Sequence, residues 1–178
     1  MKVIKSKVPY RSLLNQGDKK YDYVDSFQGS IIGNENKLNS TDIAKAFFSS
    51  APNWVDKLMG FRNKMVAIVG LKTSGSTADR QKDLDNLKCE KGEQVGIFRF
   101  YDKTENEIIL GEDDKHLNFR VSLYLEKSKF KQEERKLIIS TAVIFNNWFG
   151  RLYFLPVRAF HIPIVGTMLK ATVRKLKK

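Results

Sequence analysis

Four strand-like runs in the second half of the chain limit its fold more than any other feature. They are "QVGIFRFYD", "NEIILGE", "KHLNFRVSLYLEK" and "ERKLIISTAVIFN", which cover residues 94–102, 106–112, 115–127 and 134–146. The connecting pieces, "DKTEN", "DDK" and "SKFKQE", are short and rich in turn-forming residues. Because strands joined by such short connections run antiparallel, the sequence predicts a meander.

The alternation within these runs predicts which faces are buried. In the third run, apolar residues alternate with more polar ones: Leu117, Phe119, Val121, Leu123 and Leu125 against His116, Asn118, Arg120, Ser122 and Tyr124. Successive side chains on a strand point to opposite faces, so we expect one dry face and one wet face. The fourth run is apolar on both faces apart from Ser140 and Thr141, which predicts a central or doubly covered strand.

The first half of the chain predicts one strand and two helices. "YDYVDSF", residues 21–27, alternates as a fifth strand would, and "STDIAKAFF" begins with Ser40 or Thr41 as a helix cap and Asp42 near the positive end. Pro52 is typical of a second helix start, after which large apolar residues recur at helical spacing: Trp54, Leu58, Phe61, Met65 and Ile68. Residues 72–93 are polar and read as a mobile lid or a loop with a short helix.

The C-terminal segment, residues 146–178, predicts a long basic helix. Asn146 and Asn147 are cap candidates, and two prolines should kink or interrupt the helix, Pro156 and Pro163. Residues 152–169 are apolar enough to raise the question of a transmembrane span. Arg158, His161 and the prolines argue against one, because a charge near the bilayer centre costs about 2.5 to 3.5 kcal/mol. We therefore expect a helix packed on the sheet.

The net charge of +12 is concentrated at the two ends of the chain. Residues 1–20 hold six Lys and Arg against one acid, residues 135–178 hold nine and no acid, and the middle carries about −2. If the ends meet, they form a basic face that attracts anionic lipid, nucleic acid or an acidic ligand. The alternative is charge that serves solubility alone. No recognisable RNA- or DNA-binding motif is present, which argues against nucleic acid.

Length and cysteine usage narrow the class further. With 178 residues and 42% apolar content the chain can bury the core of one domain, residues 1–178, with a basic N-terminal extension over about 1–18. The lone cysteine, Cys89, excludes an internal disulfide and a multi-cysteine zinc site. The start has no apolar run long enough for a signal-peptide core, so we expect a cytoplasmic protein.

Four segments of the chain resemble segments of a known protein family. "DSF", "SSAPNWVDKLMGFRNKMVAIVGLK", "LGEDDKHLNFRVSL" and "NNWFGRLYFLPVRAFHIPIV" resemble an uncharacterised bacterial family, a domain of unknown function within the START/Bet v 1-like (SRPBCC) superfamily. The resemblance covers residues 9–170 and implies a helix-grip α+β fold, a curved antiparallel sheet wrapped on a long C-terminal helix. The superfamily has six or seven strands where five are evident here, and the remainder could lie near Ile31 and Ile32 or within 72–93.

The resemblance also implies a ligand cavity between sheet and helix, because superfamily members hold hydrophobic molecules there. A twisted sheet curls away from a straight rod, and proline kinks increase the mismatch, so the pieces themselves favour a pocket. The candidate ligand-binding residues are Trp54, Phe61, Phe119, Arg120, Val121, Phe145, Phe154 and Phe160. The alternative is that these side chains fill one another. Arg120 could instead pair with a carboxylate or bind an anionic head group.

Few residues are candidates for catalysis or metal binding. "GEDDKH" suits a hairpin turn, but His116 or His161 could act as a base with Asp113 or Glu112 as the orienting acid. A metal site would need both histidines to converge, and the sequence has no phosphate loop, serine elbow or CxxC. Three hypotheses remain: a module that binds a small hydrophobic molecule or lipid, a cyclase or dehydratase-type enzyme, and peripheral association with an anionic membrane through the basic C-terminal helix. The sequence favours the first and predicts no cofactor.

Overall fold

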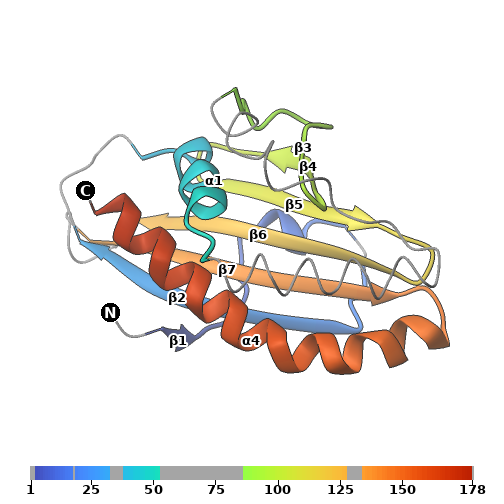
Figure 1. Ribbon diagram of the computed structural model, residues 1–178. Coiled ribbons are helices and arrows are strands. Elements are labelled where there is room, and N and C mark those ends of the chain that lie inside the picture. Colours follow the sequence, from blue (N-terminus) through green and yellow to red (C-terminus); the bar gives the residue numbers. More distant parts are fainter. Residues whose placement is uncertain (1–2, 18, 33–37, 53–85, 128–133, 178) are drawn as a thin grey trace.

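A single antiparallel sheet with a long helix across one face dominates the molecule. The computed structural model describes residues 3–17, 19–32, 38–52, 86–127 and 134–177, and these form a seven-stranded sheet in the order β1-β2-β7-β6-β5-β4-β3. The C-terminal helix, α4, lies diagonally over the strands β2 and β7 (Figure 1). The α+β helix-grip fold predicted from the sequence is confirmed.

The four predicted runs and the fifth strand are all present. The strands are β1 (Ile4–Lys5), β2 (Tyr23–Ile32), β3 (Gln94–Val95), β4 (Phe98–Lys103), β5 (Glu107–Asp113), β6 (Leu117–Lys127) and β7 (Glu134–Phe145). Neighbouring strands pair antiparallel throughout, with Leu123 of β6 opposite Ile139 of β7. β7 lies between β2 and β6, so the prediction of a central strand is confirmed.

Two short edge strands account for the difference between the five strands predicted from the sequence and the seven strands of the sheet. β1 lies in the N-terminal segment, and β3 is separated from β4 by a turn in which Gly96 has a φ of 60°. That backbone conformation favours glycine and divides what the sequence predicts as one run. Ile31 and Ile32 lengthen β2 and do not form a further strand. Most of residues 72–93 lie outside the described part of the chain.

The helices begin at asparagines. α1 (Ser40–Ser49) is capped by Asn39, whose side-chain oxygen accepts from the backbone N–H groups of Thr41 and Asp42. The predicted cap at Ser40 or Thr41 is therefore wrong by one or two residues, while Asp42 completes a capping box as expected for an acid at this end. α4 (Trp148–Leu176) is capped by Asn147, as predicted, and contains both prolines. The predicted helix that follows Pro52 lies outside the described residues.

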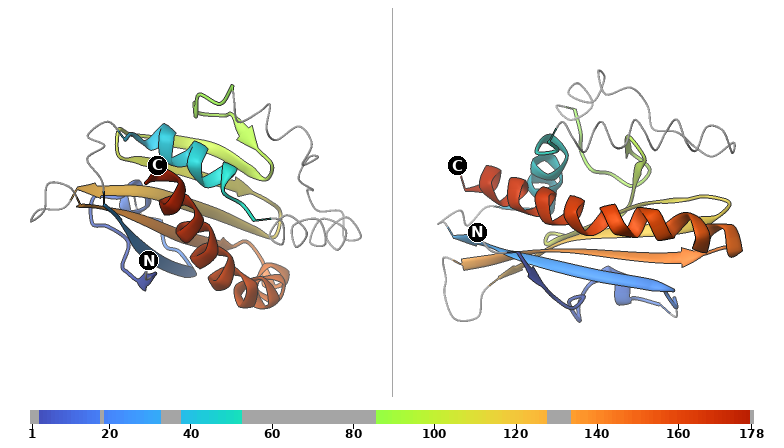
Figure 2. Two further views of the ribbon diagram at one scale, coloured as in Figure 1. Left: turned by 60° about the vertical axis from the view of Figure 1, so that its left-hand side comes forward. Right: turned by 60° about the horizontal axis from the view of Figure 1, so that its bottom comes forward.

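The two faces of the sheet are covered by different segments. α1 and α4 cover one face, here called the helix face, and the N-terminal segment with the short 3-10 helix η1 (Leu13–Asn15) lies against the other, the outer face (Figure 2). The main core fills the helix face, between the sheet, α1 and the C-terminal half of α4. Because η1 covers part of the outer face, Ser122 is fully buried there, and the prediction of a wholly wet face is wrong.

Candidate functional site

α4 is anchored to the core by its second half. The buried side chains of this half all belong to the main core cluster or lie beside it: Val165, Met168, Leu169, Thr172, Val173 and Leu176. In the first half, from Trp148 to Pro163, only Gly150 and Phe154 are buried. The helix is therefore packed on the sheet as predicted, but its first half contributes little apolar side chain to the interior.

The first half of α4 carries an apolar stripe toward solvent. Five of its large apolar side chains are exposed: Trp148 by 74%, Leu152 by 55%, Leu155 by 64%, Phe160 by 53% and Ile162 by 46%. Positions 148, 152, 155, 159 and 162 alternate in steps of four and three, which places them along one side of a helix. We call Trp148, Leu152, Leu155, Ala159 and Ile162 the apolar stripe; Phe160, although exposed, projects from a different side of the helix.

The length and composition of α4 would allow it to cross a membrane. Within its most apolar window only 22% of the residues are buried in the protein, unlike the core helix of a soluble domain. Arg158 and His161 lie within the same stretch, and the cost of placing them in the bilayer centre still argues against a span.

Polar contacts hold the first half of α4 against β2. Arg151 forms an ion pair of 3.2 Å with Asp22, and the Arg158 guanidinium lies 5.3 Å from the centre of the Tyr23 ring. One turn further on, Nε2 of His161 lies 3.3 Å from Oδ1 of Asp25. Arg151, Arg158 and His161 thus meet the beginning of β2 and the residue before it through charged or aromatic groups.

Asp25 is the centre of a small polar cluster on the helix face. The Tyr23 hydroxyl donates to Oδ2 of Asp25 at 2.6 Å, and burial together with this bond raises the pKa of Tyr23 to about 12. Thr141, directly opposite Asp25 in the register, has a buried hydroxyl that makes no hydrogen bond within the described part of the chain. A carboxylate that faces an imidazole can fix its orientation, which is the arrangement that proton transfer requires.

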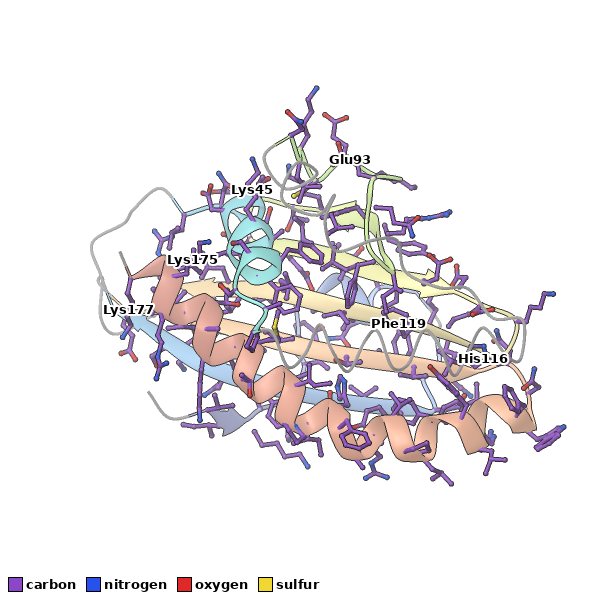
Figure 3. All side chains as sticks on the ribbon, in the orientation of Figure 1. Lys45, Glu93, His116, Phe119, Lys175 and Lys177 are labelled. Carbon is purple, nitrogen blue, oxygen red and sulfur yellow. The ribbon has the colours of Figure 1, made fainter. Side chains whose placement is uncertain are left out.

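Aromatic rings line the helix face beside this cluster. Phe98 and Phe119 meet edge to face at 5.8 Å and are only partly buried, while Phe47 and Phe48 of α1 pack behind Phe98. Figure 3 shows Phe119 near the middle of the sheet, above the first half of α4. Phe145 and Phe154 pack on each other at 5.3 Å, nearer the start of the helix.

The structure divides the predicted ligand-binding residues into groups. Phe119, Val121, Phe145 and Phe154 share the helix face with the main core or the aromatic cluster at the start of α4. Phe160 points to solvent, and Arg120 lies on the outer face, because its neighbours on β6 alternate with it. The remaining two, Trp54 and Phe61, lie outside the described residues.

His116 is buried where β6 meets the beginning of α4. Its side chain is 3% exposed, its ring meets Tyr153 edge to face at 4.7 Å, and its Nδ1 lies 3.6 Å from Oδ2 of Asp114 (Figure 3). The prediction that His116 lies on a wet face is wrong, because β6 begins one residue later and the alternation does not extend to it. Within the described part of the chain, no group of three or more His, Cys, Asp or Glu side chains could hold a metal ion.

The acids of "GEDDKH" have separate partners. Asp113 forms an ion pair with Arg120 and accepts hydrogen bonds from its Nη2 and from the Tyr101 hydroxyl, so the predicted Arg120–carboxylate pair is confirmed. Burial acts to raise the pKa of Asp113, but the guanidinium and the hydroxyl outweigh it and hold that pKa below its usual value. The turn reading of this stretch therefore accounts for most of its residues.

Cys89 has a buried thiol and a backbone in the left-handed region. It is 1% exposed and has a φ of 59°, and burial raises its pKa to about 11. The polarity of the surrounding sequence gives no sign of this, although Cys89 and Leu87 both belong to the main core cluster. A thiol in this state is a packing residue and a poor nucleophile.

Comparison with known proteins places the chain in a family without assigning it a reaction. No curated protein and no solved structure is significantly similar to it. Residues 19–168 match the family model described as protein of unknown function (DUF2867), which covers β2, α1, the meander and most of α4. The chain belongs to this family.

Proposed function

We propose that the protein binds the surface of an anionic membrane through the first half of α4. The observation that carries this proposal is the apolar stripe, whose five positions follow one side of a helix and turn away from the core. Single exposed apolar side chains are common on soluble proteins, but a row of them marks an interaction surface. A tryptophan at one end suits the level of the lipid head groups.

Charge supplies the second attraction. Arg151 and Arg158 lie on the same half of the helix, and exposed basic residues follow in the last turns: Lys170, Arg174, Lys175 and Lys177. β1 and the end of α4 lie toward the same end of the sheet (Figure 1), but the basic residues that share an element with the apolar stripe are those of α4 itself. Each Lys or Arg near an anionic surface contributes about 1 kcal/mol at physiological salt.

A second copy of the chain is the competing occupant of the apolar stripe. The four-three spacing would also suit packing of two helices against each other. Two chains of net charge +12 repel, however, whereas an anionic lipid surface attracts the same charge. The charge therefore favours the membrane, and self-association becomes an outcome that the experiment below detects.

Co-sedimentation with vesicles tests the proposal. The wild-type chain should sediment with vesicles of phosphatidylglycerol and phosphatidylcholine at low salt, and less with phosphatidylcholine alone. The double substitution Leu152→Gln and Leu155→Gln should weaken binding at least tenfold, since each removes an exposed apolar side chain whose burial in the membrane would contribute about 1.5 kcal/mol or more. The matched control, Ile4→Gln and Val24→Gln, changes aliphatic side chains that are 48% and 45% exposed on β1 and β2 and should leave binding unchanged.

Two results would contradict the membrane proposal. One is equal vesicle binding by the stripe variant and the control variant, which would leave non-specific charge as the cause. The other is a dimer in sedimentation velocity without lipid that the stripe substitutions dissociate, which would assign the apolar stripe to a second copy. Unchanged urea unfolding of both variants would show that neither result comes from a damaged fold.

The helix face favours a second candidate function, the binding of an amphipathic ligand between sheet and α4. Phe98 and Phe119 offer partly exposed rings there, and the buried Thr141 hydroxyl beside Asp25 could meet a polar end group. The resemblance to START/Bet v 1-like proteins points to the same place. Thr141→Val should stabilise the free protein by about 1 kcal/mol, because a buried hydroxyl without a partner is costly. Native mass spectrometry with palmitate should show weaker binding by the variant, and equal binding would remove this candidate.

A further inference from the structure

The outer face of the sheet holds a pocket that the membrane proposal does not use. It measures about 150 Å³ and is lined by six residues: Lys19, Tyr21, Asp113, Asn118, Arg120 and Ile144. Lys19 and Tyr21 come from the segment between η1 and β2, and the others come from the strands β5, β6 and β7. Since one liquid water takes about 30 Å³, the pocket has room for a group of several heavy atoms.

Arg120 is held in a fixed position at this pocket. Its guanidinium carbon lies 3.6 Å from the centre of the Tyr101 ring, and its two terminal nitrogens meet the two oxygens of Asp113 at 2.8 and 3.0 Å. Gly111 lies opposite Arg120 on β5, and a Cβ at Gly111 would collide with the Phe119 carbonyl oxygen and lie 3.0 Å from the Arg120 Cδ. The missing side chain leaves room for the arginine to lie across β5, so its donors are oriented before any ligand arrives.

The pocket has more donors than acceptors. Asn118 uses its side-chain oxygen to accept from the Asn146 amide, which leaves its own N–H groups for the pocket. Among the described residues, the Lys19 ammonium makes no hydrogen bond or ion pair, and the Arg120 Nε makes none. Two cations share one carboxylate, so the pocket keeps a net positive charge with three kinds of donor.

We propose that this pocket binds a small soluble oxyanion, the carboxylate or phosphate group of a metabolite. Lys19, Asn118 and Arg120 would donate to its oxygens, and the Tyr21 ring and Ile144 would contact the adjoining carbon atoms. Charge-assisted hydrogen bonds from lysine and arginine are the usual means of recognising these groups. The pocket lies on the face opposite α4, so the inference stands apart from membrane binding.

Titration by two-dimensional NMR tests the pocket directly. Inorganic phosphate and acetate are added separately to the full-length protein, with chloride at matched ionic strength as the reference. The inference predicts saturable shifts at the backbone of residues 19–21 and 118–120 and at the Asn118 side-chain amide. Lys19→Gln should weaken binding roughly threefold to fivefold, as expected for one exposed charge. Lys20→Gln is the matched control, because the neighbouring lysine is exposed, carries the same charge and does not line the pocket.

Asp113→Asn should tighten binding, since the carboxylate competes with the ligand for Arg120. Anionic vesicles should leave phosphate binding unchanged. Shifts that fail to saturate, or equal losses for Lys19→Gln and Lys20→Gln, would overturn the inference in favour of diffuse charge. Displacement of phosphate by vesicles would overturn the assignment to a soluble ligand and point to a lipid head group. The comparisons among wild type, Lys19→Gln, Lys20→Gln and Asp113→Asn are made without lipid, so they do not depend on whether the apolar stripe binds membranes.

Discussion

Gly150 and Gly166 lie on the same helix but have different surroundings. A Cβ at Gly150 would collide with the backbone carbonyl oxygen of His116, whereas a Cβ at Gly166 would meet nothing within 4 Å. The first turn of α4 therefore touches the backbone just before β6, and glycine permits that approach. The same contact brings Phe149 and Tyr153 over the His116 ring and buries it.

Substitution of the two glycines by alanine should change the free energy of unfolding in opposite directions. Gly150→Ala should lower the free energy of unfolding by about 1 to 3 kcal/mol, because the added methyl forces the helix away from the sheet. Gly166→Ala should raise it by about 0.5 to 1 kcal/mol, because alanine has the higher helix propensity. Urea unfolding of both variants measures the difference, and a destabilised Gly166→Ala protein would disagree with the packing described.

Tyr23 gives a prediction in alkaline solution. Its pKa is raised from 10.0 to about 12, chiefly by burial and then by its bond to Asp25, so the folded state keeps the phenol protonated when the unfolded chain has lost the proton. The stability that this provides is complete below pH 10 and is lost as the pH rises through 12. Wild type should lose more stability than Tyr23→Phe over that interval. Tyrosinate absorbance should show one fewer late-titrating group in the variant, and titration of Tyr23 near pH 10 would contradict the contact.

At the scale of elements, α4 consists of a half held by apolar packing and a half held by polar contacts. The second half buries six side chains beside α1 and the sheet. The first half relies on Phe154 and on contacts with Asp22, just before β2, and with Tyr23 and Asp25 of that strand. The sequence predicts the helix and its cap, because Asn147 and the apolar content are local signals. It does not predict which half faces solvent, because the apolar residues of the first half surround the helix and show no single buried side.

Two aspartates, Asp22 just before β2 and Asp25 within it, allow the polar contacts to be compared. Asp25 is 8% exposed and meets both Tyr23 and His161, so Asp25→Asn should cost about 1 to 3 kcal/mol of stability, the usual penalty for a buried partner lost. Asp22 is exposed, and Asp22→Asn keeps an oxygen that can still accept from the Phe145 N–H, so it should cost less than about 1 kcal/mol. Thermal unfolding distinguishes them, and equal costs would mean that the buried cluster does not fasten the helix.

At the scale of the whole molecule, the sequence predicts the sheet better than its surroundings. The four runs and their short connections specify order and direction, so the meander and its central strand follow from periodicity. The sequence pattern does not predict which segment covers the outer face. The N-terminal segment that does so is polar and basic, and it buries Ser12 and Leu14 through one short turn. Its partner there is the buried Glu107, which accepts from the Ser12 and Ser122 hydroxyls and from the Leu13 N–H.

The site residues also divide into those that the sequence pattern predicts and those that depend on the tertiary structure. Phe119, Val121, Phe145 and Phe154 follow from strand alternation or helical position and lie on the predicted face. The sequence does not indicate Asp25 and Thr141 as site residues, since only the pairing of β2 with β7 places them opposite each other, with Asp25 in contact with His161. The pocket around Arg120 was equally hidden, because Lys19 is distant in sequence and the role of Gly111 depends on its strand neighbour.

The fluorescence of Trp148 on vesicles tests the membrane proposal most directly. The chain has two tryptophans, so Trp54→Phe leaves Trp148, at the start of the apolar stripe, as the sole reporter. Its side chain is 74% exposed, and its emission should move to shorter wavelength when phosphatidylglycerol vesicles are added and be quenched by brominated acyl chains. Emission that stays at the water-exposed position, at lipid concentrations where the protein sediments with the vesicles, would contradict the account.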